Sequence, residues 1–141
     1  SEPEEHRRAL LHELGLTAVD PRDVPAGRAD VVLECVGYPQ TLQAAMDASR
    51  PHATIVLVGL AQETLPFDAT ALVMGERRVI GSAVYTPSDF ADVAAWVAET
   101  ELPLERMIQE RTDLDGLPDA FARYADHTLT AVKTLVAIGG R

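Results

Sequence analysis

The stretches DVVLECVG at residues 30–37 and TIVLVGL at residues 54–60 decide the fold. Each is a nearly continuous apolar run, rich in β-branched residues, and each reaches a glycine at or near its end, Gly37 or Gly59. Such runs are typical of strands buried on both faces of a parallel sheet. Residues 41–49 between them have helical spacing. We therefore predict a strand, helix, strand unit with a right-handed crossover.

The rest of the chain continues this alternation. Strands are predicted at residues 78–85, 107–114 and 131–138 and a short one at 17–20, with helices within 3–14 and 69–77, one beginning at Pro87 and one capped by Asp115. Alternating strands and helices predict an α/β class with a mainly parallel sheet and flanking helices. A chain of 141 residues is long enough for one domain with its own core.

Local end signals support two of the predicted helices. Gly15 is placed to end the first one, and Thr86, Pro87 and Asp89 form an N-cap, N1 and N3 pattern for a later one. We expect the buried stripes to be Leu42, Ala45 and Met46 in the crossover helix, Phe90, Val93, Ala94 and Val97 in the helix after Pro87, and Leu117, Ala120, Phe121 and Tyr124 in the last helix.

Composition excludes several function classes. A net charge of −10 disfavours a nucleic acid or an anionic membrane surface as a partner. No apolar run approaches the ~20 residues of a membrane-spanning helix, and no secretory signal opens the sequence, so we expect a cytoplasmic protein. Cys35 is the only cysteine; this excludes an intrachain disulfide, and its apolar surroundings predict an inert core thiol.

No metal site is predicted. The four histidines, His6, His12, His52 and His127, have no ligand-type spacing. Asp113 and Asp115 are read as turn and capping residues, because nothing pairs them as a general acid and base.

A glycine-rich phosphate loop is also missing. The nine glycines contain no pair separated by a single residue, so no GxGxxG occurs. The two glycine turns nevertheless follow strands of an open α/β sheet, where ligands bind. The runs therefore look like the later half of a dinucleotide-binding sheet whose phosphate loop would precede residue 1, and the chain reads as part of an enzyme.

The stretches DVVLECVG, RPHATIVLVGL, VMGERRVIGSAVY and AVKTLVAI resemble the cofactor domain of the medium-chain zinc-type alcohol dehydrogenases. GERRVIGSAVYTPSDF is most similar to the butanediol, sorbitol and threonine dehydrogenase branch. The resemblance implies that residues 1–141 are a single NAD(P)-binding Rossmann-type domain truncated at its N-terminal side. It lacks the first strand, the glycine loop and the GroES-like catalytic domain that carries zinc in the family.

The same resemblance implies the cofactor residues. Glu2, thirteen positions before Gly15, would bind the adenosine ribose, and its charge would favour NAD over NADP by repelling the 2′-phosphate. Arg7 would lie at the adenosine end, and Lys133 would meet the pyrophosphate. The remaining contacts would come from Val36, Gly37 and Thr41 at the first glycine turn, Val58, Gly59 and Leu60 at the nicotinamide, and Ala83 and Val84 at its carboxamide.

The implied reaction is hydride transfer between a secondary alcohol or polyol and nicotinamide C4, with zinc polarising the substrate oxygen. Zinc ligands and proton relay would lie in the catalytic domain, so no catalytic residue is predicted here and the chain alone should be inactive. Two alternatives stay open: a non-catalytic structural or assembly module, and another Rossmann-like enzyme such as a methyltransferase. The role of Glu34, which would pair with a basic group or neighbour the site, also stays open.

Two sheet edges need cover. We expect a homodimer in which residues 78–85 pair with the same strand of a second copy. The outer edge of the strand at residues 30–37 would be apolar and unpaired. We expect it to be covered by the missing segment, by another copy or by residues 17–20.

Overall fold

The structure, a computed structural model, describes residues 1–61, 64–126 and 128–139. The chain forms two compact units. The central unit comprises Pro21–Glu99, and the terminal unit comprises Ser1–Asp20 together with Thr100–Arg141. Each unit is described by itself.

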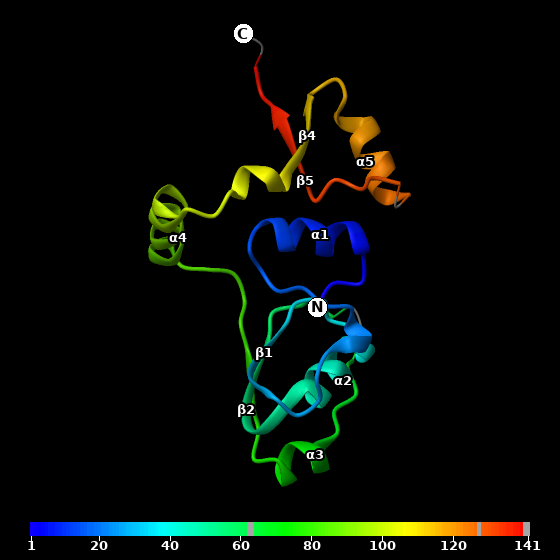
Figure 1. Ribbon diagram of the computed structural model, residues 1–141, viewed down its shortest axis with the longest axis vertical. Helices are drawn as coiled ribbons and strands as arrows, with labels where there is room; N and C mark the ends of the chain where they lie inside the picture. Colours follow the sequence, from blue (N-terminus) through cyan, green and yellow to red (C-terminus); the bar gives the residue numbers. More distant parts are fainter. Residues whose placement is uncertain (62–63, 127, 140–141) are drawn as a thin grey trace. The chain divides into compact units, whose positions relative to one another are not determined.

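The central unit is built on a three-stranded parallel sheet of order β1-β2-β3 (Figure 1). Its strands are β1 (Ala29–Glu34), β2 (Ser49–Leu57) and β3 (Arg78–Gly81), connected by α2 (Pro39–Ala48) and α3 (Ala69–Met74), after a 3-10 turn η1 (Pro21–Asp23). The predicted strand, helix, strand unit is therefore confirmed. The third strand is shorter than predicted, because residues 82–85 leave the ladder.

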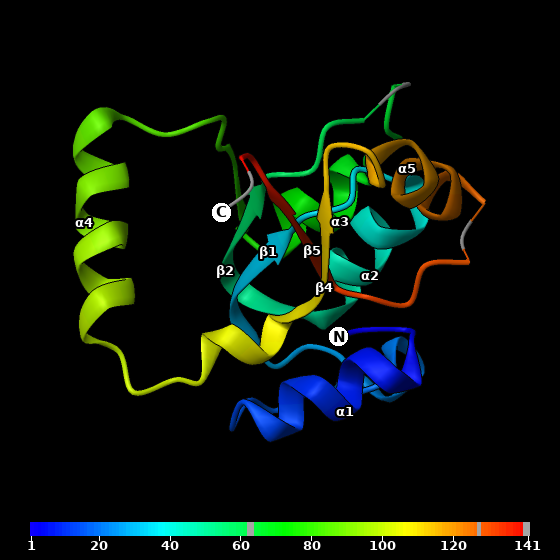
Figure 2. The same ribbon diagram turned by 90° about the horizontal axis from the view of Figure 1, so that it is seen from above.

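The core of the central unit lies on one face of this sheet. Ile55 of β2 is fully buried against Ala45 and Met46 of α2, and Ala71 and Leu72 of α3 pack on the same cluster. Figure 2 shows both helices beside the sheet. The inward face predicted for α2 is thus confirmed.

The opposite face of the sheet is open, and here the sequence-based expectation is wrong. Val31 is 58% exposed and Leu33 is 63% exposed, whereas Val32 and Glu34 between them point toward the covered side. Side chains of a strand alternate between faces, so a single layer of helices buries only every second residue. Cys35 is exposed as well, which corrects the prediction of a core thiol.

β1 is also an edge strand. Residues 17–20 form no strand, so the described part of the chain places nothing in register beside the outer edge of β1. Residues 17–20 belong to the terminal unit, and the cover of this edge stays a prediction.

The register between β1 and β2 is interrupted near His52. The pairing passes from Ala29–Ser49 to Val31–Thr54, which leaves extra residues on β2. His52 has a φ of 66°, and its N–H donates to the Gly75 carbonyl at 2.8 Å. A left-handed backbone at a residue with a Cβ is strained.

Helix α4 (Pro87–Glu99) begins as predicted. Thr86 N–H donates to Asp89 Oδ2 at 2.8 Å, and Asp89 N–H donates back to Thr86 Oγ1 at 3.2 Å. The bond from Thr86 N–H, together with one from Thr86 Oγ1 to Asp89 Oδ2 at 2.8 Å, lowers the pKa of the Asp89 carboxyl. The predicted burial of its apolar stripe is wrong, because Phe90, Val93 and Val97 are exposed and no residue of α4 is buried.

The terminal unit contains a second parallel pair, β4 (Ile108–Asp113) with β5 (Lys133–Ala137). Its helices are α1 (Glu5–Glu13), the 3-10 turn η2 (Leu104–Met107) and α5 (Leu117–Ala125). Gly15 follows α1 with a φ of 77°, as its predicted role as the terminating glycine requires.

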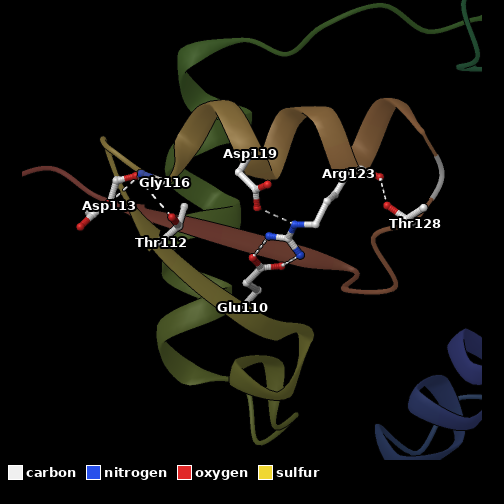
Figure 3. A network of polar contacts seen from close by, with 7 residues as sticks. All are labelled: Glu110, Thr112, Asp113, Gly116, Asp119, Arg123 and Thr128. Atoms are coloured by element: carbon white, nitrogen blue, oxygen red, sulfur yellow. Dashed lines mark hydrogen bonds and ion pairs between the residues drawn. The ribbon is translucent and has the colours of Figure 1, made fainter.

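Polar contacts fix α5 to β4 (Figure 3). Arg123 pairs with Asp119 on its own helix at 3.0 Å and with Glu110 of β4. Gly116 N–H, at the N-cap of α5, donates to Asp113 Oδ1 at 2.9 Å, and no side chain among the described residues caps this helix, so the cap predicted at Asp115 is wrong.

The apolar stripe predicted for α5 is only partly buried. Ala120 is buried and Leu117 half-buried, whereas Phe121 and Tyr124 are exposed. The class is α/β with parallel strands and flanking helices, as predicted, but the described residues form two sheets in place of one. No helix among the described residues has the length and apolarity to cross a membrane.

Candidate functional site

The carboxyl ends of the three strands in the central unit lie side by side. Glu34 at the end of β1 is in register with Leu57 of β2, and Leu57 is in register with Gly81 of β3. Ser82 N–H then donates to the Leu57 carbonyl at 2.9 Å, which keeps the segment after β3 at this edge. Eight predicted cofactor residues follow these strand ends: Val36, Gly37, Thr41, Val58, Gly59, Leu60, Ala83 and Val84.

The first two turns at this edge are in direct backbone contact. A Cβ added at Gly59 would lie 2.3 Å from Gly37 N and 2.5 Å from backbone atoms of Val36. A Cβ at Gly37 would lie 2.8 Å from Ala61 N, and its φ is 88°. Only glycine allows this approach. Both turns therefore require the glycines that the sequence places there.

Glu34 connects these turns. The residue is 4% exposed, and its carboxylate accepts hydrogen bonds from Val36 N–H, Gly37 N–H and Thr41 Oγ1. Burial opposes ionisation of Glu34, but the bonds from Gly37, Thr41 and Val36 outweigh burial and lower the pKa of its carboxyl. The open question about Glu34 is thus answered: it neighbours the candidate site and has no basic partner among the described residues.

The spacing of Glu34 could have indicated this role. A carboxylate at a strand end, followed by a glycine three residues later and a hydroxyl seven residues later, can accept from the turn and from the first turn of the next helix.

Hydrogen bonding also limits what the turns can offer a ligand. The amides of Val36 and Gly37, near the start of α2, already donate to Glu34, so they are not available to a phosphate. The amides of Val58 and Gly59 donate to the Glu34 carbonyl at 2.8 Å and 2.9 Å. The second turn can therefore offer its carbonyl oxygens, which suit a ligand with N–H donors.

The other three predicted residues belong to the terminal unit. Glu2 accepts from Glu4 N–H through Oε1 at 2.9 Å, at the start of α1. Arg7 has a buried Nε with no hydrogen-bond partner, which suits an anion. Lys133 is exposed at the first position of β5. Val84 in the central unit is also exposed and has a φ of 51°.

The described residues do not fit a zinc centre. They contain no group of three or more His, Cys, Asp and Glu side chains that could hold a metal. His6 contacts the Thr130 carbonyl at 3.2 Å, and His52 lies 3.4 Å from a Glu76 oxygen. His127 lies outside the described residues.

Comparison with known proteins identifies the family. Residues 1–99 match the sequence profile described as zinc-binding dehydrogenase. D-xylulose reductase of Saccharomyces cerevisiae is 28% identical over 127 residues, covering 90% of this chain and 36% of the reductase. (R,R)-butanediol dehydrogenase of Neisseria gonorrhoeae is 31% identical over 108 residues, covering 76% of this chain and 30% of that enzyme.

A solved structure has the same fold. The putative zinc-binding dehydrogenase of Sinorhizobium meliloti bound to NADP is 29% identical, with a TM-score of 0.82 over 97% of this chain and 44% of that one. The chain thus spans less than half the length of the proteins it matches. Because the family profile covers residues 1–99, more than half of the sequence, this chain belongs to the zinc-binding dehydrogenase family.

Proposed function

We propose that this chain is the cofactor-binding portion of a zinc-type dehydrogenase that transfers hydride between a secondary alcohol or polyol and NAD. The observation that carries the proposal is the edge formed by β1, β2 and β3, where two glycine turns touch and eight expected cofactor residues follow adjacent strand ends. The family of the chain and the names of its relatives supply the reaction class.

The second glycine turn is assigned to the nicotinamide carboxamide. The Val58 and Gly59 amides already donate to Glu34, so carbonyl oxygens of this turn meet the N–H donors of the carboxamide. Ala83 and Val84 add backbone groups from the neighbouring segment. Gly59 lets the first turn approach this one closely, because a Cβ there would lie 2.3 Å from Gly37 N.

The charged residues of the terminal unit are assigned to the other half of the cofactor. Arg7 supplies positive charge at the adenosine end, Lys133 supplies it to the pyrophosphate, and Glu2 accepts from the ribose hydroxyls. Glu4 N–H occupies only Oε1 of Glu2. The negative charge of Glu2 would repel a 2′-phosphate, so NAD is proposed over the NADP seen in the S. meliloti relative.

When bound, NAD would supply the hydride acceptor for an alcohol that gives up a hydride from its carbinol carbon and a proton from its hydroxyl to become a ketone. The residues of this chain bind and orient the cofactor in that reaction. No catalytic residue and no zinc ligand is assigned to them, so we propose that the chain alone does not oxidise alcohols. A cytoplasmic location is part of the same proposal.

Calorimetric titration with NADH and NADPH tests this assignment. We expect saturable binding that favours NADH and weakens in Glu2→Ala, because that variant removes the ribose acceptor. Glu5→Ala is the matched control, since it removes an exposed carboxylate from the first turn of α1. Absence of binding at millimolar cofactor would reject the cofactor role and favour the non-catalytic module.

We further propose that residues 78–85 pair across a two-fold axis in a homodimer. Ser82 N–H already donates to Leu57 of the neighbouring strand. Because the N–H groups of successive strand residues point to opposite sides, the Gly81 N–H faces the free edge. Gly81→Pro should shift sedimentation toward the monomer, whereas Gly81→Ala, which keeps the donor, should not. A dimer that persists in Gly81→Pro would contradict this pairing.

A further inference from the structure

Glu34 contacts both glycine turns through different atoms. Its backbone carbonyl accepts Val58 N–H at 2.8 Å and Gly59 N–H at 2.9 Å. These two bonds fix the turn that follows β2. The position of that turn therefore depends on where the end of β1 lies.

The side chain of Glu34 fixes the other turn. Oε1 accepts Val36 N–H and Gly37 N–H at 2.9 Å each and the Thr41 hydroxyl at 2.7 Å, and Oε2 accepts Gly37 N–H at 3.1 Å. No ion pair of the described residues includes this carboxylate. Burying a charge without a cation is expensive unless hydrogen bonds replace its water. These donors do so, and they hold the β1–α2 turn in one conformation.

The two turns are also coupled sterically. Gly59 and Gly37 approach so closely that a methyl group at either glycine would overlap backbone atoms of the other segment. A shift of the first turn therefore displaces the second. Loss of the carboxylate would move both, although the carbonyl bonds to Val58 and Gly59 remain.

We propose that Glu34 is a positioning residue for the nicotinamide half of the cofactor and that the carboxylate acts through Gly37 and Gly59 without touching the ligand. This inference rests on the proposed function. In this role Glu34 sets the distance between the two turns. That distance determines where the carbonyl oxygens that receive the carboxamide lie. The adenosine half, assigned to residues of the terminal unit, does not depend on it.

Glu34→Gln isolates the role of the charge. The glutamine retains one oxygen for Val36 and Thr41, but its NH₂ group faces the Gly37 donor that Oε2 accepts. Titration of the chain with NADH and with ADP-ribose, which lacks nicotinamide, separates the two halves of the cofactor. We expect the Kd for NADH to rise about tenfold, as for one charge-assisted hydrogen bond, while the Kd for ADP-ribose changes less than about twofold.

Asp30→Asn is the matched control, because Asp30 is an exposed carboxylate on the same strand, bonded to Arg50 at the opposite end of β1. It should leave both Kd values unchanged. If Glu34→Gln does not fold, Glu34→Asp keeps the charge but draws the carboxylate back from Gly37 and Thr41, and it should show the same selective loss for NADH.

Each outcome decides one question. A wild-type chain that binds neither ligand rejects the proposed function and this inference with it. If the wild type binds and Glu34→Gln weakens NADH and ADP-ribose equally, the residue supports only the general fold and positioning is overturned. Unchanged binding of both ligands in Glu34→Gln overturns positioning as well, while the proposed function stands.

Discussion

Replacing Gly59 by alanine should destabilise the central unit for a purely steric reason. The added Cβ would lie 2.3 Å from Gly37 N and 2.5 Å from the N and carbonyl C of Val36, where ordinary contact begins at 3.4 Å. All three neighbours are backbone atoms, so no side chain can rotate away. Neither Gly59 nor Gly81 has a φ in the left-handed region. Gly81→Ala is therefore the matched control, since nothing lies within 4 Å of its Cβ.

The expected magnitude follows from this overlap. Overpacking a rigid site costs about 1–3 kcal/mol, and a clash of about 1 Å with backbone on the neighbouring turn places Gly59→Ala near the upper value. With an m-value of about 2 kcal/mol per M urea, the midpoint should fall by about 1.5 M. Gly81→Ala should change stability by less, or raise it by about 0.5 kcal/mol through the unfolded state.

Urea unfolding followed by circular dichroism measures the difference between these variants. Because the two units can unfold separately, amide exchange at Ile55, which is fully buried in the central unit, reports on the relevant sheet. If Gly59→Ala is as stable as Gly81→Ala within about 0.5 kcal/mol, the contact between the turns is not as tight as the structure has it.

Three further substitutions test other features of the central unit. His52→Gly should raise stability by about 0.5–1 kcal/mol by relieving its left-handed backbone, and an equal gain in His52→Ala would rule that cause out. Because the pKa of Glu34 is lowered in the folded state, its carboxylate stabilises the fold fully above the ordinary glutamate pKa. This contribution disappears as the pH falls through the pKa of the folded state. Glu34→Gln should therefore flatten the acid side of a stability profile, and an unaltered acid side would contradict this. Arg77→Ala should cost about 2 kcal/mol in a urea titration, because buried Ser49 loses two hydrogen bonds, while a similar loss in exposed Arg78→Ala would refute it.

Local chemistry made much of this fold predictable from the sequence. The terminating role of Gly15 and the reciprocal bonds between Thr86 and Asp89 depend on residues within a few positions of each other, and the structure has both. The strand runs at residues 30–37 and 54–60 were recognisable because their β-branched content and glycine ends are also local properties.

Burial was less predictable, because it depends on what lies opposite each residue. An apolar stripe predicts which face of a helix prefers to be covered, but it does not specify the covering surface. Phe90 of α4 and Phe121 of α5 lie on the predicted stripes and are exposed in the structure. The same reasoning failed for Cys35, which lies in an apolar run of the sequence but is exposed.

Glu34 shows how a residue that conflicts with its local pattern can mark a candidate site. A carboxylate in a buried apolar run has a high desolvation cost, so the sequence alone implied that something must compensate for it. Either a salt bridge or a set of backbone donors would meet that requirement. The conformation of the residues that follow the strand decides which of these groups reach the carboxylate. The structure supplies the donors from Val36, Gly37 and Thr41, all C-terminal to Glu34 and within seven residues of it. The compensation is therefore local although the burial is not. This is why a carboxylate that looks misplaced in a strand can be the group that shapes the turn beside it.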